Sequence, residues 1–249
     1  MPQVTIATFN IRNSRGLDGR NIWWLRRGNT LRVIQSLNAD VICLQEVRFG
    51  QLHWLRRHLD DYELAGVGRD DGVSKGEHLV IAVRKANLSA GPVRTRWFSS
   101  TPDRPSRDPQ SAFNRMAISI ELRADGKTFT VVNTHLEERH ESVRREAIRM
   151  LADWFPGDAV LVGDFNTTVD DLALEPLWRA GYQDVLGITP PSGPGLATHH
   201  SFSGTRDGTR IDHILVPGST NVVSAAIVHD RPPGPLPSDH WPVVATVII

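Results

Sequence analysis

Short apolar runs alternate with longer amphipathic segments from one end of the chain to the other. Some runs alternate apolar and polar residues, which is typical of half-buried β-strands, and others are apolar throughout, which is typical of strands covered on both faces. We expect strands at Val4–Phe9, Val41–Leu44, Leu79–Val83, Met116–Leu122, Phe129–Val132, Ala159–Val162, Ile211–Val216, Val222–Val228 and Val243–Ile249.

Helical patterns lie between these strands. The segment Glu141–Trp154 places apolar residues on one stripe and most of its charged residues outside it. Trp24–Leu37 and Leu52–Leu59 are predicted helices as well. This alternation predicts an α+β fold in which packed sheets are covered by helices. No repeat or Pro/Gly/Ser-rich linker divides the chain, so we expect a single domain over residues 1–249.

The segment Trp97–Arg115 is too rich in proline for the interior of a strand or helix, and it predicts a long loop. Long loops in compact domains are often functional, and a plain surface excursion is the alternative.

Composition narrows the class of protein. The chain has 249 residues, of which 40% are hydrophobic and 22% charged, and these values exclude a disordered or fibrous protein. No apolar stretch is long enough for a membrane helix, and no export signal is visible, so we expect a cytoplasmic protein. The single cysteine, Cys43, excludes an intramolecular disulfide framework and a cysteine-built zinc site. Its apolar neighbours indicate a buried filler.

The net charge is zero, with 28 basic and 28 acidic residues. A surface coated by nucleic acid would normally carry a basic excess. A neutral balance still permits a phosphate substrate, because a bound divalent cation can supply positive charge locally.

Polar side chains follow several predicted strands at the point where each strand ends. Strand ends face outward from a packed sheet, so their side chains can converge on a cleft while the strands hold them rigid. The residues placed in this way are Asn10, Glu46, His135, Asp164 and Asn166, with Asp239 and His240 before the last strand. Asp212 instead lies inside a strand, where a carboxylate costs stability unless it has a partner.

These residue types can act together on a metal ion and a phosphate. Asn, Glu and Asp are hard oxygen donors suited to Mg²⁺ or Mn²⁺. His135 and His240 can hydrogen-bond or protonate phosphoryl oxygens near neutral pH, and Asp164 or Asp212 can orient or deprotonate water or fix a histidine. Each residue alone also has a structural interpretation, as a turn residue, cap or ion-pair partner. No GxSxG, P-loop or HExxH motif is present, which disfavours serine hydrolases, P-loop NTPases and zinc proteases.

The order of the motifs is far more specific than any one of them. The motifs are Thr8-Phe-Asn-Ile11, Leu44-Gln-Glu-Val47, Asn133-Thr-His-Leu136, Gly163-Asp-Phe-Asn166, Arg210-Ile-Asp-His213 and Ser238-Asp-His240. In this order they closely resemble the endonuclease/exonuclease/phosphatase superfamily, which includes apurinic endonucleases, pancreatic deoxyribonuclease, deadenylases and inositol polyphosphate 5-phosphatases. The resemblance implies a DNase I-like four-layer α/β-β/α sandwich, with two mixed sheets flanked by helices and the site at one end.

The resemblance also implies a metal site. Mg²⁺ (or Mn²⁺) would be held chiefly by Glu46, with Asn10 and Asp239 nearby.

Catalytic roles follow from the same resemblance. Asp164 would align or activate the attacking water, and Asn166 would orient the scissile phosphate. His240, paired with Asp212, would stabilise charge on the phosphoryl oxygens, and His135 would hydrogen-bond the same group. In-line attack by water needs positioning and charge neutralisation more than a covalent nucleophile.

The sequence Gly66–Gly72, followed by Gly76-Glu77, resembles a bacterial branch nearer to the deadenylases than to exonuclease III. Glu77 would support the site through an arginine, and Arg115 would contact phosphate, with a structural ion pair as the alternative for Arg115. The chain departs from that branch at residues 78–83, which are not aromatic-rich, and it lacks an obvious counterpart of the tyrosine that apurinic endonucleases place near the phosphate.

The predicted function is metal-dependent hydrolysis of a phosphate ester, with nucleic acid as the favoured substrate class and a monomer as the expected state. Small phosphorylated metabolites or lipid headgroups are the alternative, and a catalytically silent binding protein is a further one. The loop with Arg104, Arg107 and Arg115 is a candidate for contacting a single strand through charge and stacking, with Trp97 and Phe98 beside it. Alternatively, the two aromatic residues anchor the core.

Overall fold

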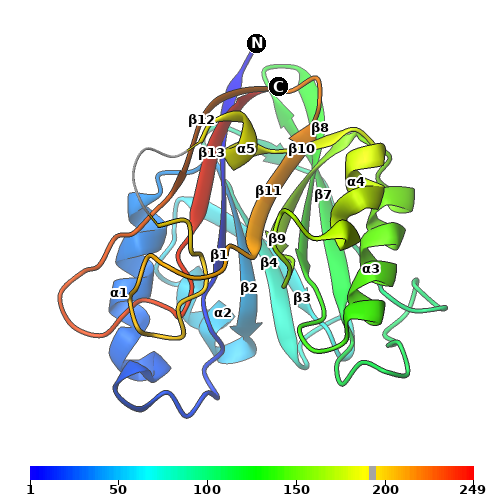
Figure 1. Ribbon diagram of the computed structural model, residues 1–249. Coiled ribbons are helices and arrows are strands. Elements are labelled where there is room, and N and C mark those ends of the chain that lie inside the picture. The colour runs from blue at the N-terminus through cyan, green and yellow to red at the C-terminus, as the bar shows by residue number, and fades with distance from the viewer. Residues whose placement is uncertain (191–194) are drawn as a thin grey trace.

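Two β-sheets pack face to face, and helices cover the outer face of each sheet (Figure 1). The structure is a computed structural model that describes residues 1–190 and 195–249. Within these residues, the first sheet contains β1 (Gln3–Asn10), β2 (Val41–Arg48), β3 (Tyr62–Gly68), β4 (Glu77–Arg84), β12 (Asn221–Ile227) and β13 (Val243–Ile248). The second contains β5 (Ser89–Ala90), β6 (Arg94–Trp97), β7 (Met116–Ala124), β8 (Lys127–His135), β9 (Ala159–Asp164), β10 (Tyr182–Asp184) and β11 (Asp212–Pro217).

Four α-helices lie in the outer layers: α1 (Trp23–Ser36), α2 (Phe49–Arg56), α3 (Glu141–Trp154) and α4 (Glu175–Arg179), with short 3₁₀ turns at Gly19–Asn21 and Leu172–Leu174. The short helix α5 (Val185–Ile188) instead contacts strands of both sheets, and Val185 and Leu186 belong to the core between them. In Figure 1, α1 and α2 flank the first sheet, and α3 and α4 flank the second. These four layers confirm the predicted sandwich. No helix among the described residues is long and apolar enough to cross a bilayer.

Strand periodicity explains why the sheets are covered on both faces. In β1, Val4 and Ile6 face the layer between the sheets, whereas Ala7 and Phe9 pack under α1 and α2. Strands of this kind are apolar throughout because neither face meets water. Cys43 lies in the layer between the sheets, as the sequence predicted, and burial raises the pKa of its thiol.

Each sheet is built around one parallel strand pair. The order is β12–β13–β1–β2–β4–β3 in the first sheet and β10–β11–β9–β8–β7–β5 in the second, where β6 also pairs with β7. β1 and β2 are parallel and joined through α1, and β8 and β9 are parallel and joined through α3. Their neighbours β4, β13, β7 and β11 run antiparallel to them. The carboxyl ends of four central strands and the amino ends of their neighbours therefore share one edge.

Every strand and helix predicted from the sequence is present, but the pattern missed several short elements. The missed strands are β3, β5, β6 and β10, and the missed helices are α4 and α5. β3 contains Gly66 and Gly68, which lower its strand propensity. Gly66 is required there because a Cβ would lie only 2.2 Å from the carbonyl oxygen of Leu79 on β4.

The predicted long loop begins at Phe98, one residue after β6. Trp97 and Phe98 are only 4% and 3% exposed, and the Phe98 ring stacks on Trp154 with centroids 5.4 Å apart. These two aromatic residues are therefore core anchors and cannot stack on a nucleic-acid base. The loop returns to the sheet at Arg115, beside the shared edge.

A buried asparagine joins the two sheets close to this edge. Asn133 on β8 donates from Nδ2 to the carbonyl oxygens of Leu44 (3.0 Å) and Val80 (2.9 Å), and it accepts from Gln45 Nε2 at 2.8 Å. The two carbonyls belong to β2 and β4, next to an irregularity in their pairing between Leu44 and Val47. One amide thus satisfies polar groups that the irregular ladder would leave unpaired in the core.

We predict that Asn133→Ala lowers the free energy of unfolding by about 2–4 kcal/mol, because three buried polar groups lose their partner. Urea denaturation of the purified protein measures this change. The control is Asn87→Ala, which removes an exposed asparagine bonded to Asp40 and should change stability by less than about 0.5 kcal/mol. Equal effects of the two substitutions would contradict the bridging role.

Candidate active site

The polar residues that the sequence places at strand ends meet at the shared edge. Asn10, Glu46, His135 and Asp164 come from β1, β2, β8 and β9, Asp212 begins β11, and Asp239 and His240 precede β13. Asn10 Nδ2 donates both to Glu46 Oε1 (3.2 Å) and to Asp164 Oδ2 (3.0 Å), and so it connects the two sheets. Residues far apart in the chain are therefore linked directly in space.

Asp164 lies between two histidines. Its Oδ2 is 3.6 Å from His135 Nε2 and 3.9 Å from His240 Nε2. The other ring nitrogen of His240, Nδ1, is 2.9 Å from Asp212 Oδ2, so the buried carboxylate of Asp212 has the partner that the sequence required. Thr198 Oγ1 accepts the backbone N–H of Asp212, which holds this part of the chain in place.

Burial and these neighbours set the charges. Burial and the adjacent Asp212 raise the pKa of Asp164 to about 7. Burial alone would lower the pKa of His240, but Asp212 and Asp164 outweigh it and raise that pKa to about 10. Burial and the nearby Arg115 lower the pKa of His135 well below 6.5. Near pH 7 Asp164, close to its own pKa, therefore lies between the charged imidazole of His240 and the neutral imidazole of His135.

Asn166 lies next to this group. Its backbone N–H donates to Asp164 Oδ1 at 2.9 Å, and its side-chain Nδ2 donates to the carbonyl oxygen of Leu136 at 3.0 Å. Its φ angle of 51° lies in the left-handed region, which is unfavourable for a residue other than glycine. The surrounding hydrogen bonds hold this conformation and fix the Asp164 carboxylate.

Glu46 lies inside β2 and not after its end as the sequence suggested, because β2 continues to Arg48. It occupies the irregularity in the β2–β4 pairing and has a φ of 59°. Such bulges re-aim a side chain out of the strand's alternation. Glu46 Oε2 accepts from the backbone N–H (3.0 Å) and from Nδ2 (2.8 Å) of Asn13.

Asp239 and Glu46 face a common cation. The guanidinium of Arg12 lies 3.7 Å from Asp239 Oδ2 and 4.0 Å from Glu46 Oε2. Burial alone would raise the pKa of Glu46, but His135, the N–H of Asn13 and Arg12 outweigh burial and lower it to about 2. Glu46 therefore stays ionised near pH 7, and Arg12 lies within 4.0 Å of both carboxyl groups.

Glu77 and Arg115 border the same edge. Glu77 pairs with Arg69, which is the arginine that the sequence argument expected but did not name. Arg115 is buried with its Nε 3.7 Å from Glu137 Oε2, and its Nε and Nη1 make no hydrogen bond. Arg69 Nε also makes none. Both guanidiniums line a small space of about 10 Å³ beside Glu46 and His135.

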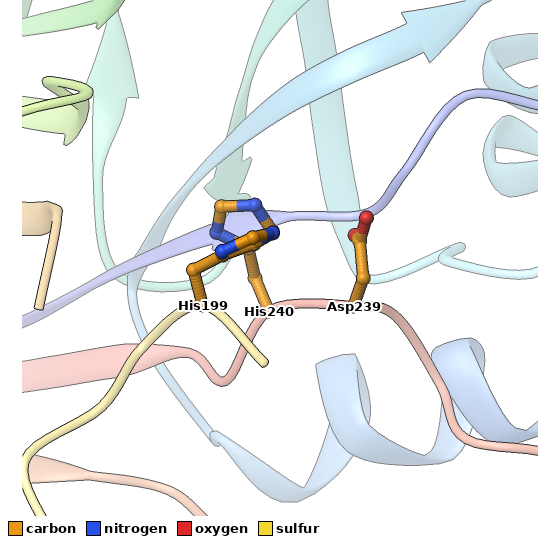
Figure 2. A group of neighbouring side chains, drawn as sticks. All are labelled: His199, Asp239 and His240. Carbon is orange, nitrogen blue, oxygen red and sulfur yellow. The ribbon is translucent and has the colours of Figure 1, made fainter. Parts of the chain in front are cut away.

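His199 lies at the site and was missed by the sequence analysis. It forms an antiparallel bridge with His240, and the two rings have centroids 4.8 Å apart. Figure 2 shows the two imidazoles side by side, with the Asp239 carboxylate next to them. The sequence contains the pair His199-His200 shortly before the strand that carries Asp212, and this pair could have indicated a further histidine at the site.

Two groups of potential metal ligands occur among the described residues, and both contain His240. One is His199, Asp239 and His240, and the other is Asp164, Asp212 and His240, each with ligand atoms within 4.8 Å of one another. Glu46 belongs to neither group, and Arg12 connects it to Asp239. The edge as a whole offers hard oxygen and imidazole donors, which suit a divalent cation.

A DNase I-like sandwich with carboxylates and histidines at one sheet edge defines the class of this protein. The sequence matches the Endonuclease/Exonuclease/phosphatase family over residues 7–240, and the chain belongs to this family. Members of the family are hydrolases that act on phosphoesters. The family and fold predicted from the motif order are thereby confirmed, and the kinship with the deadenylase-like branch stays a prediction.

Three relatives show the extent of the similarity. A family member from Bacteroides vulgatus is 29% identical, with a TM-score of 0.92 and 100% coverage of both chains. The mannosyl-6-phosphatase of Bacteroides thetaiotaomicron is 26% identical, with a TM-score of 0.91, and the match covers 99% of this chain and 100% of that one. An "uncharacterized protein" of Acanthamoeba polyphaga mimivirus is 28% identical over 202 residues, or 74% of each chain.

We predict that His240 titrates near pH 10 and that Asp212→Asn moves its pKa to a lower value, because the substitution removes the carboxylate that favours the imidazolium. NMR titration of the imidazole signals measures both values. The control is Asp184→Asn, which alters a second buried carboxylate–histidine contact, Asp184 to His213, and should leave the titration of His240 unchanged. A pKa near 6.5 in the unsubstituted protein would contradict the charge assignment.

Proposed function

We propose that this protein is a divalent-metal-dependent phosphoesterase that hydrolyses a phosphodiester or phosphomonoester by in-line attack of an activated water. The observation that carries the proposal is the position of Asp164 between His135 and His240, with Asp212 behind His240. This arrangement combines a base, a fixed cation and a neutral hydrogen-bonding group within one buried cluster.

Asp164 is the candidate general base. A pKa of about 7 suits this role, because a base is most effective when its pKa is near the working pH. Asn10 donates to Oδ2 and the Asn166 N–H donates to Oδ1, so the carboxylate has a fixed orientation toward the attacking water.

The two histidines are candidates for stabilising the phosphoryl group. His240 is an imidazolium near neutral pH, and its Nε2 faces Asp164 and the site while Nδ1 is held by Asp212. A fixed cation aimed at developing negative charge stabilises a transition state. His135 remains neutral and can hydrogen-bond the same group, and the side chain of Asn166 would orient it.

The residues at the edge fit a divalent cation. Glu46 and Asp239 supply carboxyl oxygens, Asn10 supplies an amide, and Arg12 lies beside both acidic side chains. When bound, Mg²⁺ or Mn²⁺ would neutralise charge on the phosphate ester. Asn13 Nδ2 donates to Glu46 Oε2 (2.8 Å) and to Glu77 Oε1 (3.2 Å), so it joins Glu77 on β4 to the same site.

Arg115 and Arg69 are candidate phosphate contacts. Each is a buried guanidinium with at least one N–H group that makes no hydrogen bond, and such groups are costly unless a ligand satisfies them. Both border the small space beside Glu46 and His135. Their free donors favour phosphate recognition over the purely structural ion pair for Arg115.

Nucleic acid is the favoured substrate class, because residues 12–57 contain nine arginines and three carboxylates, and the exposed Trp24 lines a cavity with Arg27 and Arg57. A small phosphorylated sugar is the second candidate. The mannosyl-6-phosphatase from Bacteroides thetaiotaomicron, which is 26% identical over nearly the whole chain, supports that alternative.

The decisive assay measures hydrolysis of bis(p-nitrophenyl) phosphate and p-nitrophenyl phosphate with Mg²⁺ or Mn²⁺, with and without a chelator. We expect turnover that the chelator abolishes. A panel of single- and double-stranded DNA, abasic DNA, RNA, sugar phosphates and phospholipids then ranks the substrates. Metal-independent turnover, or no turnover by folded protein, would refute the proposal.

We predict that Asp164→Asn lowers kcat at least about 1,000-fold, because it removes the base, and that His240→Ala has a comparable effect. The melting temperature of Asp164→Asn should be unchanged or higher, because the amide is not repelled by Asp212. Steady-state kinetics and thermal melts measure these effects. Asp153→Asn, at an exposed position on α3, is the control and should retain activity. If Asp164→Asn retained the kcat of the unsubstituted protein, the assignment of Asp164 as the general base would be contradicted.

A further inference from the structure

A second cavity lies beside the candidate active site, on the outer layer of the first sheet. It has a volume of about 600 Å³, which is in the range of ligand-binding pockets. Its walls come from the beginning of α1 and from α2, the helices on the left in Figure 1. Its main lining residues are Trp23, Trp24, Arg27, Trp54 and Arg57, and we refer to it as the tryptophan–arginine cavity.

Aromatic rings and a guanidinium are stacked in this cavity. The guanidinium of Arg27 lies 4.6 Å from the ring centroid of Trp24 and 5.5 Å from that of Trp54. Trp23 is buried and packs edge-on against Trp54 at 5.6 Å, which fixes that ring. Trp24 is 70% exposed, an unusual position for an indole. The cavity thus offers an accessible indole ring next to cationic groups.

Most residues that line the tryptophan–arginine cavity belong to a strongly basic segment of the chain. Residues 12–57 contain nine arginines and only three carboxylates, so this segment carries +6 within a chain whose total charge is zero. The net charge of zero, which argued against a surface coated by nucleic acid, therefore includes a strongly basic segment at residues 12–57. Such a segment attracts polyanions.

Residues 13 and 14 connect the cavity to the candidate active site. Ser14 and Gln51 line the cavity, and the backbone N–H of Ser14 donates to Gln51 Oε1 at 3.0 Å. The preceding residue, Asn13, donates to both Glu46 and Glu77. One wall of the cavity is therefore formed by the residue next to the one that holds Glu46.

We propose that the tryptophan–arginine cavity is a subsite for single-stranded nucleic acid, in which a base that flanks the scissile phosphate stacks on Trp24 and the neighbouring phosphates contact Arg27 and Arg57. This proposal rests on the phosphoesterase function proposed above. Stacking on an aromatic ring together with a basic groove is the general mode of single-strand binding.

The shape of the tryptophan–arginine cavity favours a nucleic acid over a membrane surface as its binding partner. A membrane-binding element presents a protruding apolar face, whereas here the indoles line a hollow and alternate with guanidinium, imidazole and amide groups. A planar base with polar edges and an attached phosphate matches that mixture.

The test uses Trp24→Ala and Arg27→Ala, each in an Asp164→Asn background so that the ligand is not hydrolysed. The matched controls, Leu172→Ala and Arg179→Ala, remove an exposed apolar residue and an exposed arginine from the opposite outer layer. Fluorescence anisotropy measures the Kd of a labelled single-stranded DNA dodecamer at several salt concentrations with Mg²⁺ present. Hydrolysis of bis(p-nitrophenyl) phosphate is measured in parallel with the same substitutions in chains that keep Asp164.

Trp24→Ala should weaken DNA binding about tenfold without changing its salt dependence, because it removes stacking only. Arg27→Ala should weaken binding and reduce the slope of log K against log salt by about one. The controls should bind as before, and all four substitutions should leave hydrolysis of the small ester unchanged.

Unchanged DNA affinity in Trp24→Ala and Arg27→Ala, or an equal loss in the controls, would overturn the subsite. It would also be overturned if the two substitutions abolished cosedimentation with phosphatidylserine vesicles and left DNA binding intact. Absence of small-ester hydrolysis in the unsubstituted protein would instead refute the proposed function, so the two failures are distinguishable.

Discussion

The burial of several carboxylates at one edge of the sandwich is the constraint on which the rest of the site depends. Asp164 and Asp212 are almost inaccessible to solvent, and Glu46 and Asp239 lie beside them. Buried carboxylates are tolerated only when cations and hydrogen bonds compensate for lost hydration. His240 and Arg12 supply part of that compensation, and the raised pKa of Asp164 shows that it is incomplete. The oxygen and imidazole donors gathered at this edge suit a divalent cation.

The topology explains why these residues meet although the chain separates them widely. Two parallel pairs, β1–β2 and β8–β9, lie in different sheets and end at the same edge. Asn10 and Asn133 connect the sheets there, one within the site and one in the core beneath it. The apolar layers hold the strands rigid, so the left-handed conformations of Glu46 and Asn166 persist at this edge.

Much of this arrangement could be predicted because its signals are local. The period of the apolar runs locates the central strands, and strand ends locate Asn10, His135 and Asp164. Glu46 was placed after its strand because a bulge depends on the register with β4, which no local pattern contains. Arg69 and His199 were missed for a related reason, since only the folded chain brings their loops against Glu77 and His240. The basic segment at residues 12–57 was not recognised from the sequence, because the net charge is a sum over the whole chain.

The most direct measurement of the central claim is a crystal structure of the protein with Mn²⁺ and a phosphate ester analogue, using the anomalous signal of manganese. The account predicts an anomalous peak bonded to Glu46, with the phosphoryl group between the metal and His240. An absence of manganese at this edge when the analogue is bound, or a peak that lies away from Glu46 and Asp239, would contradict it.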